Sequence, residues 1–287
     1  MKKLLILGST GFIGKNMYDY FKDKYLVYAP MKIQLDALSE INIYEHLSKN
    51  YYDVIINALD IREFNQYYLE HRLRMYTNLE RFNNLYGKMI YFGSGAEYAR
   101  ELPINSIVED EFDRKIPEDT YGFCLHQISK SAMISKNIYN FRLFGIFGKY
   151  EIWQKRFISN AICKALYGYP ITIRQNTVFD YLFIDDLCKI VEWAIEATPN
   201  YHDYNAVSGK KYDLKELADI INTITKNSAP VLIASEGYDK EYTASCGRLM
   251  NEIYNYKSEP IEDSIRKMIA WYQQNLDLID RQKLLYQ

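Results

Sequence analysis

The sequence predicts an α/β fold, a doubly wound parallel sheet followed by a smaller, mainly helical C-terminal region. Two observations lead to this prediction. Short apolar runs alternate with longer helical patterns up to about residue 150, and helical patterns dominate after it. The first apolar run, residues 4–7, leads through a glycine-rich turn at residues 8–14 into an amphipathic segment. Strand, turn and helix in this order begin a parallel sheet, whose ligands bind beyond the carboxyl ends of the strands.

The glycine-rich turn carries the first functional prediction. Glycines spaced in this way let the backbone turn tightly and approach a pyrophosphate, while the helix N-terminus offers free N–H groups and a positive dipole end. An ordinary strand-to-helix turn is the alternative, but the position directly after the first apolar run favours a dinucleotide site. The expected contacts are Gly8, Ser9, Thr10, Gly11, Phe12, Ile13 and Gly14.

The remaining elements follow from periodicity. Strands are predicted at residues 4–7, 25–29, 53–58, 88–93 and 137–143, and helices at 12–23, 41–50, 64–86 and 119–136. Further helices are predicted at 152–167, 184–197, 213–225 and 260–275, and residues 179–186 are expected to rejoin the main sheet. We therefore expect a dinucleotide-binding domain over residues 1–150, to which residues 178–206 return, and a substrate-binding region over residues 151–287.

Composition limits the possible partners. The chain has 287 residues, 48% of them hydrophobic, and a formal net charge of −2, so it has no basic excess for binding nucleic acid. No apolar run approaches the roughly 20 residues that span a bilayer. The four histidines lack metal-ligand spacing, so no metal site is expected. The four cysteines form no CxxC pair, which favours free thiols and a cytoplasmic location.

Several short motifs lie at predicted strand ends and helix starts. They are Asn57-Ala58, Asn78, Gly93-Ser94, Tyr98, Tyr121-Gly122, Arg142-Leu143-Phe144, Phe147-Gly148 and residues 180–186. With the glycine turn, their order and spacing make nearly the whole chain resemble the extended short-chain dehydrogenase/reductase family. Members of that family have a Rossmann-type sheet. They include nucleotide-sugar epimerases, dehydratases and 4-keto-sugar reductases.

The resemblance implies roles for individual residues. Ser94 would donate a hydrogen bond to the sugar carbonyl, and Tyr121 would exchange a proton with its oxygen while the nicotinamide exchanges a hydride with its carbon. The other cofactor contacts that it implies are Asn57, Ala58, Leu59, Asn78, Gly93, Tyr121 and Leu143. A turn residue and a helix-capping aromatic are the structural alternatives for Ser94 and Tyr121.

One position departs from the family pattern, which has a lysine four residues after the tyrosine, where this chain has Leu125. A lysine there would hold the nicotinamide ribose and stabilise the phenolate. Neither His126 nor Lys130 lies on the helix face that carries Tyr121, so neither can replace this lysine. An isolated phenol, with a pKa of about 10, is protonated at neutral pH and suits ketone reduction, whereas alcohol oxidation needs the phenolate. Leu125 therefore favours a reductase, with an inactive nucleotide-binding relative as an open alternative.

The segment after the second strand, Ala29-Pro30-Met31-Lys32, contains no acid for a ribose 2′-hydroxyl. Lys32 suits the 2′-phosphate of NADPH, which is the predicted cofactor, although Lys32 could equally be a solvated surface residue. Asp36 is either an adenine contact or a cap for the helix that begins near Ser39.

Among the branches of this family, residues 34–38 and Gly93-Ser94 most resemble GDP-fucose synthases and dTDP-4-keto-rhamnose reductases. GDP-fucose synthases epimerise with a cysteine two residues after the serine and a histidine in the substrate region. Here Ala96 stands at the first position, and no histidine occurs between His126 and His202. The expected activity is NADPH-dependent C4 reduction of a 4-keto-6-deoxy nucleotide sugar, GDP-linked and without epimerisation, for a bacterial surface polysaccharide. An NAD-dependent epimerase or dehydratase is the second interpretation.

The resemblance also implies substrate contacts at Ser94, Gly95, Ala96, Glu97, Trp153, Lys155, Arg156 and Phe157. Lys155 and Arg156 suit a diphosphate, although they could equally lie on an exposed helix. Family members often carry an arginine directly before the position of Asp180, where this chain has Phe179. Lys240 or Arg248 is therefore expected to help bind the diphosphate. In similar proteins the helices matching 64–86 and 119–136 pair across a dimer axis, so a homodimer is expected.

Overall fold

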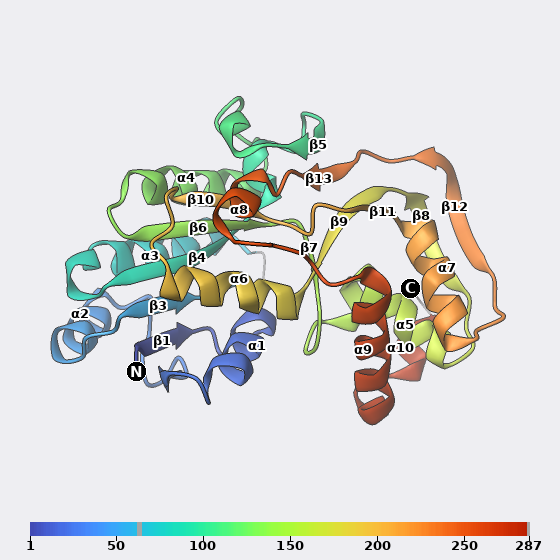
Figure 1. The fold of residues 1–287 in the computed structure, drawn as a ribbon, viewed down its shortest axis with the longest axis horizontal. Helices are drawn as coiled ribbons and strands as arrows, with labels where there is room; N and C mark the ends of the chain where they lie inside the picture. The colour runs from blue at the N-terminus through green and yellow to red at the C-terminus, as the bar shows by residue number, and fades with distance from the viewer. Residues whose placement is uncertain (62–64, 286–287) are drawn as a thin grey trace.

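The computed structural model describes residues 1–61 and 65–285. A parallel sheet of six strands forms its centre, in the order β10-β6-β4-β3-β1-β2 (Figure 1). Its strands are β1 (Lys3–Leu7), β2 (Leu26–Tyr28), β3 (Val54–Asn57), β4 (Lys88–Ser94), β6 (Ile138–Leu143) and β10 (Asp203–Ala206). The strands β1, β3 and β4 bury apolar side chains on both faces, as is typical of strands covered by helices on each side. This arrangement confirms the predicted α/β, Rossmann-type fold.

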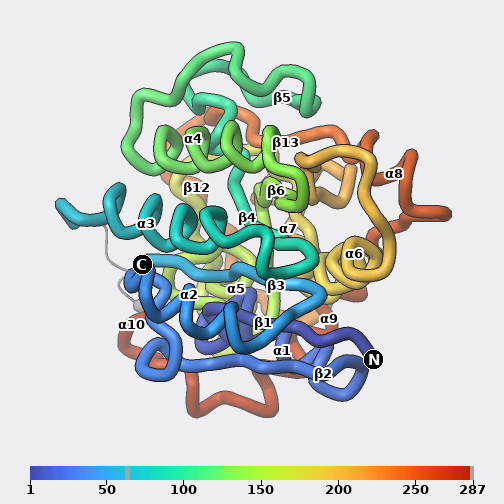
Figure 2. Tube along the Cα trace, turned by 90° about the vertical axis from the view of Figure 1, so that its left-hand side faces the viewer, coloured from blue at the N-terminus to red at the C-terminus, as the bar shows by residue number. Residues whose placement is uncertain are grey.

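Helices cover both faces of the sheet (Figure 2). On one face α1 (Phe12–Phe21) and α6 (Ile184–Glu196) pack against Leu4 and Ile6 of β1. On the other face lie α2 (Glu40–Lys49), α3 (Tyr68–Glu80) and α4 (Thr120–Ile134), which cover Leu5 and Leu7. Asp119 caps α4 by accepting a hydrogen bond of 2.8 Å from the Gly122 N–H. The helix predicted at 64–86 is shorter than expected, and its predicted first residue, 64, lies outside the described residues.

The strand order reverses its direction beside β1. The chain runs from β1 to the edge strand β2, and then returns to β3 on the opposite side of β1. The connections that leave β1 and β3 therefore diverge, and this topological switch point is where open parallel sheets bind ligands. The glycine-rich turn follows β1 directly and lies at this point.

Outside the main sheet the chain contains more strand than the sequence indicates. A second sheet has the order β11-β9-β13-β5, with β7 also paired to β9, and β8 pairs with β12. Their bounds are β5 (Ile104–Ile107), β7 (Gly145–Phe147), β8 (Ile171–Asn176), β9 (Val178–Phe183), β11 (Lys211–Asp213), β12 (Val231–Tyr238) and β13 (Tyr242–Ala244). The expectation that residues 179–186 join the main sheet is wrong, because β9 pairs with β7, β11 and β13. The return to the main sheet is made by β10, which pairs with β6.

The remaining helices lie mostly beside these strands, at the right of Figure 1. They are α5 (Phe157–Leu166), α7 (Leu214–Thr225), α8 (Gly247–Glu252), α9 (Ile261–Gln274) and α10 (Arg281–Leu285). Short 3-10 turns lie at Asn83–Leu85, Gly95–Tyr98, Glu109–Glu111, Trp153–Lys155 and Leu276–Leu278. Within residues 1–61 and 65–285, no helix combines the length and the apolar character needed to cross a membrane.

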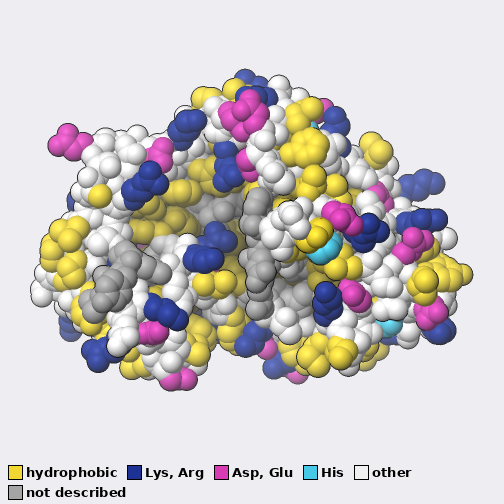
Figure 3. Space-filling view, turned by 180° about the vertical axis from the view of Figure 1, so that it is seen from behind, with side chains coloured by type: hydrophobic (Ala, Val, Ile, Leu, Met, Phe, Trp, Pro, Cys, Tyr) yellow, Lys and Arg dark blue, Asp and Glu magenta, His cyan; other side chains and the backbone are white. Residues whose placement is uncertain are grey.

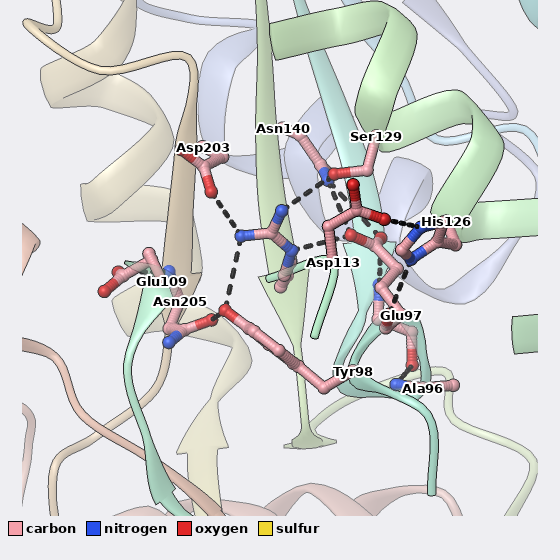
Figure 4. Close-up of polar contacts among 12 residues, drawn as sticks. Ala96, Glu97, Tyr98, Glu109, Asp113, His126, Ser129, Asn140, Asp203 and Asn205 are labelled. Carbon is pink, nitrogen blue, oxygen red and sulfur yellow. Dashed lines mark hydrogen bonds and ion pairs between the residues drawn. The ribbon is translucent and has the colours of Figure 1, made fainter. Parts of the chain in front are cut away.

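A buried arginine joins β6 to β10, to α4 and to the turn that follows β4. Figure 4 shows its partners Asp203, Ser129 and Glu97. Arg142 of β6 has no exposed surface, and its Nε donates to Glu97 Oε2 at 2.6 Å. Its Nη1 donates to Asp203 Oδ2 of β10 at 2.5 Å, and its Nη2 donates to Ser129 Oγ of α4 at 2.8 Å. The second oxygen of Glu97 accepts from the Ser94 N–H at 2.9 Å. The turn that follows β4 is therefore held in place from within the core.

Further side chains extend this network. Tyr98 Oη donates to Asn205 Oδ1 at 2.7 Å. His126 Nδ1 lies 2.9 Å from the Glu97 carbonyl oxygen, and its Nε2 lies 2.9 Å from Asp113 Oδ1. These contacts fix α4 against the 3-10 turn at Gly95–Tyr98.

Replacing Arg142 by Met should destabilise the protein strongly, because it leaves Glu97 buried without its cation and removes one of the two arginines that pair with Asp203. Removing one partner of a buried pair costs about 3–5 kcal/mol. Urea denaturation at neutral pH measures the free energy of unfolding. Arg74→Met removes an exposed pair with Glu70 and serves as the matched control, with an expected loss below about 1 kcal/mol. Equal losses in the two variants would contradict the central role of Arg142.

Candidate functional site

The glycine-rich turn packs its backbone directly against the end of β3. Gly8 has a φ of +79°, which other residues rarely adopt, and a Cβ there would lie 2.4 Å from the Ala58 carbonyl oxygen. A Cβ at Gly14 would lie 2.2 Å from the Gly8 carbonyl oxygen. Gly11 is the N-cap of α1 and has no side chain to cap it. The N–H groups of Phe12 and Ile13 therefore begin a helix that is suited to an anion.

Other predicted cofactor residues surround this turn. Asn57 is buried, and its Oδ1 accepts from the Leu59 N–H at 3.3 Å, which shapes the turn after β3. The Ala58 N–H donates to the Leu7 carbonyl oxygen at 3.0 Å. Asn78 Nδ2 donates to the Ala37 carbonyl oxygen at 2.8 Å, so it braces the loop that follows β2. These hydrogen bonds order the loops that follow β2 and β3, on either side of β1.

The loop after β2 places its two candidate residues differently. Lys32 is exposed on a turn. Asp36 Oδ1 accepts from the Leu38 N–H at 3.0 Å, so Asp36 stabilises its own turn. The cap of α2 is Ser39, whose hydroxyl accepts from the Asn42 N–H at 3.3 Å. The alternative interpretation of Asp36 as the helix cap is therefore wrong.

Ser94 and Tyr121 belong to elements in direct contact. Ser94 ends β4, and Tyr121 lies in the first turn of α4. A Cβ at Gly122 would lie 2.8 Å from the Ala96 carbonyl oxygen, so only glycine lets the start of α4 approach the serine turn this closely. Both side chains are half-buried. A hydroxyl and a phenol are thus held at the carboxyl edge of the main sheet.

Tyr242, which the sequence did not single out, reaches the same place from β13. Its Oη lies 3.5 Å from Ser94 Oγ, and its ring packs 4.9 Å from that of Phe144. Burial raises the pKa of the Tyr242 phenol, so it stays protonated and can donate to the serine. No motif could have indicated Tyr242, because its place depends on the pairing of β13 with β5 and β9.

The structure corrects the role expected for Glu97. Its side chain is fully buried, and Arg142, Asn140 and the Ser94 N–H bind its carboxylate. A sugar hydroxyl cannot reach it. Gly95 and Ala96 are also buried, in the same turn. Gly93 is required because a Cβ there would lie 1.9 Å from Glu97 Oε1, and Leu143 pairs with Ser94 across the two strands.

Leu125 is fully buried in the apolar layer between α4 and the sheet. Lys130 instead pairs with Asp113 at 2.9 Å. A cation does approach this layer from α3: Arg72 is 6% exposed, donates from Nη2 to Tyr91 Oη at 3.3 Å and pairs with Asp60. In the sequence, Arg72 stands out only as a charged residue within the otherwise apolar helix face that contains Tyr68, Tyr76 and Leu79.

The predicted substrate residues after residue 150 divide into two groups. Lys155, Arg156 and Phe157 line a hollow of about 750 Å³, together with Arg174 of β8 and apolar residues of β12. Figure 3 shows the face of the molecule opposite to that of Figure 1, hollowed near its middle and bordered by Lys and Arg side chains.

Trp153 and Arg248, two of the expected substrate contacts, lie outside this hollow. Trp153 is 5% exposed, and its Nε1 donates to the Leu278 carbonyl oxygen at 3.0 Å, so Trp153 has a structural role. Arg248 pairs with Asp203 at 2.5 Å and with Asp110 at 2.6 Å, which places it in the Arg142 network rather than in the hollow. Lys240 lies in the loop between β12 and β13.

Comparison with known proteins agrees with this geometry. Residues 4–206 match the NAD dependent epimerase/dehydratase family. No protein of curated function matches the chain in sequence.

Three solved structures illustrate the likeness of fold. A GDP-L-fucose synthetase from Naegleria fowleri bound to NADP has a TM-score of 0.82 at 13% identity, over 96% of this chain and 95% of that one. A dTDP-glucose 4,6-dehydratase from Bacillus anthracis in complex with NAD has a TM-score of 0.80 at 15% identity, over 96% and 98%. A GDP-mannoheptose C4 reductase from Campylobacter jejuni with NADP bound has a TM-score of 0.76 at 15% identity, over 95% and 98%.

The family match covers more than half of the chain and includes the glycine-rich turn, the serine turn, the start of α4 and the last strand of the main sheet. The chain therefore belongs to the NAD dependent epimerase/dehydratase family.

Proposed function

We propose that this protein is an NADPH-dependent reductase of a 4-keto nucleotide sugar, GDP-linked, which leaves the other stereocentres of the sugar unchanged. The observation that carries the proposal is the contact at Gly122, which joins the start of α4 to the Ser94 turn beside the switch point of the sheet. It brings a proton donor and a hydrogen-bond donor to the edge where the glycine-rich turn would hold a dinucleotide.

Each residue has a defined task in this reaction. Ser94 donates a hydrogen bond to the carbonyl oxygen and is itself oriented by Tyr242 and the Ala96 N–H. Tyr121 gives its phenolic proton to that oxygen as negative charge develops on it. Bound NADPH supplies the hydride.

The absence of epimerisation follows from the side chains around the serine. Ala96, two residues after Ser94, is 1% exposed and cannot exchange a proton. Both ring nitrogens of His126 already have partners, Glu97 and Asp113. Neither residue can remove a proton from a sugar carbon, which supports reduction alone.

The cofactor preference rests on the loop after β2. Lys32 is exposed there, and residues 29–32 contain no acid that would repel a 2′-phosphate. Two of the similar solved structures, the fucose synthetase and the mannoheptose reductase, were determined with NADP. Both observations favour NADPH over NADH.

The hollow beside α5 supports a nucleoside-diphosphate substrate, and we propose that residues 151–287 form the region that binds it. Lys155, Arg156 and Arg174 offer positive charge, while Leu232 and Ile233 offer an apolar wall for a base or sugar. The GDP linkage is proposed from the likeness to GDP-sugar reductases. A role in bacterial surface-polysaccharide synthesis is proposed from the family resemblance of the sequence alone. A homodimer through α3 and α4 is proposed because Phe123, Met133 and Ile134 of α4 leave apolar surface exposed.

The direct test follows NADPH absorbance while purified protein is given a freshly prepared GDP-4-keto-6-deoxy sugar. We expect consumption of NADPH with formation of one alcohol epimer, and slower turnover with NADH or with a dTDP-linked sugar. Binding of NADPH without turnover of any keto sugar would reject the reductase and indicate a nucleotide-binding protein. Release of tightly bound NAD from the purified protein would instead indicate an epimerase or dehydratase.

Tyr121→Phe removes the proposed proton donor while keeping the ring. We expect kcat to fall by about 10²–10⁴-fold, the usual contribution of a general acid. Tyr67→Phe changes an exposed tyrosine near the start of α3 and is the control. Full activity of Tyr121→Phe in a steady-state assay would remove Tyr121 from the mechanism.

Arg174→Ala should raise the KM for the nucleotide sugar by about 10–100-fold, because a charge-assisted hydrogen bond contributes about 1.5–3 kcal/mol. The KM for NADPH should stay unchanged, since the hollow lies apart from the glycine-rich turn. Lys215→Ala, on the exposed face of α7, is the control. If only the KM for NADPH rose, the hollow would not be the sugar-nucleotide site.

A further inference from the structure

Three aromatic side chains form a continuous row on one face of the second sheet. Residues that face each other across paired strands lie on the same face of a sheet, and so do residues two apart on one strand. Phe179 of β9 faces Tyr242 of β13, and Tyr181 follows Phe179 by two residues. The ring of Phe179 lies 6.0 Å from that of Tyr242 and 5.6 Å from that of Tyr181. We call these three residues the aromatic row.

The two ends of the aromatic row reach the two parts of the proposed site. At one end, Tyr242 Oη lies 3.5 Å from Ser94 Oγ. At the other end, burial raises the pKa of the Tyr181 phenol, and the charge of Arg156 lies near enough to oppose this rise. Arg156 lines the hollow beside α5. The row therefore connects the serine proposed to bind the sugar carbonyl with the cations proposed to bind the diphosphate.

Two glycines make room for the ends of the aromatic row. A Cβ at Gly95 would lie 2.6 Å from Tyr242 Oη. Gly145 of β7 faces Tyr181, and a Cβ there would lie 2.9 Å from the Tyr181 ring. Both ends thus pack on backbone that carries no side chain. Each of the three rings is half-buried and keeps part of its surface accessible, so the row is an open surface as well as a packing layer.

The aromatic row offers carbon atoms rather than hydrogen-bonding groups. Phe179 has no polar side-chain atom. The hydroxyl of Tyr242 has Ser94 as its partner, and burial around the Tyr181 phenol raises its pKa. Aromatic rings stabilise the C–H groups of a ligand by burying apolar area. A ligand hydroxyl placed on the same rings loses water without gaining a partner. The row therefore favours the apolar side of a sugar.

We propose that the aromatic row is the floor of the sugar subsite and that Phe179, its central ring, is a specificity-determining residue that distinguishes a methyl from a hydroxymethyl group on the sugar. This inference rests on the proposed function and deepens it. Ser94 binds the carbonyl at one end of the row, and the hollow binds the diphosphate at the other. The sugar ring joins these two groups, so it lies across Phe179.

The first experiment compares two ligands that differ only in the hydroxyl at C6. Isothermal titration calorimetry measures the Kd of the purified protein for GDP-6-deoxy-D-mannose, for GDP-D-mannose and for GDP, in the absence of NADPH. We expect the 6-deoxy sugar to bind about tenfold or more tightly than its hydroxylated counterpart, which is within the range that a hydrophobic contact provides. Equal Kd values for the two sugars would overturn the proposal.

Phe179→Ala removes the central ring. The preference for the 6-deoxy sugar should disappear, while the Kd for GDP should stay unchanged because the hollow is built from other residues. Phe82→Ala removes a half-buried ring that packs on Tyr44 just after α3, and it is the matched control that should keep the preference. If Phe179→Ala keeps the preference, or weakens GDP and sugar binding equally, Phe179 has only a structural role and the proposal fails.

A measurement on the wild type covers the case in which Phe179→Ala does not fold. Saturation-transfer difference NMR, with irradiation of the aromatic protons of the protein, reports which ligand protons lie against aromatic rings. The C6 methyl protons of GDP-6-deoxy-D-mannose should receive the strongest saturation of all the sugar protons. Saturation confined to the guanosine protons would show that the sugar does not contact the aromatic row, and would overturn the proposal.

A second pair of ligands separates this inference from the proposed function. dTDP-6-deoxy-D-glucose and dTDP-D-glucose repeat the comparison with another base. A preference for either 6-deoxy sugar supports the role of Phe179 even when no keto sugar is reduced, so failure of the reductase leaves it standing. Binding of these nucleotides without the preference rejects the inference alone, and binding of none of them rejects both.

Discussion

A guanidinium without access to water organises the functional end of the sheet. Arg142 satisfies Glu97 and Asp203 at once, and Glu97 in turn holds the Ser94 N–H. Desolvating these charges is expensive, so the three groups are stable only in one mutual arrangement. That arrangement fixes β4, β6 and β10 relative to each other, and it gives the serine turn a rigid support. The chemistry proposed for Ser94 and Tyr121 depends on this support rather than on the flexibility of a loop.

Local signals predicted the main sheet well. The glycine-rich turn, the apolar runs of β1, β3, β4 and β6, and the helices that follow them are encoded within a few residues, and periodicity reveals them. The second sheet could not be predicted in this way, because several of its strands have only three or four residues and pair with segments far away in the sequence. Glu97, Trp153 and Arg248 were misassigned for a related reason. A charged or aromatic side chain looks functional in the sequence, and only its long-range partners show that it is structural.

Leu125 is the position at which this chain departs most clearly from the family pattern. From the sequence, the missing lysine favours reduction, because nothing on α4 would stabilise a phenolate. The proposed reductase also rests on other observations: the buried Ala96, the hydrogen-bonded His126 and the loop that carries Lys32. The family shares a fold across opposite reaction directions, so such local chemistry must decide between them.

The contact between Gly122 and the Ala96 carbonyl has a consequence for how this protein could diversify. The spacing of the two reacting groups is set by backbone touching backbone, and hardly by any side chain that also meets the substrate. The hollow formed by α5, β8 and β12 is built from other parts of the chain. Substitutions in this hollow could therefore change which sugar or base is bound, while the spacing of Ser94 and Tyr121 stays the same. Residue 122 is closed to such change, since a single methyl group there would separate the donor from its serine.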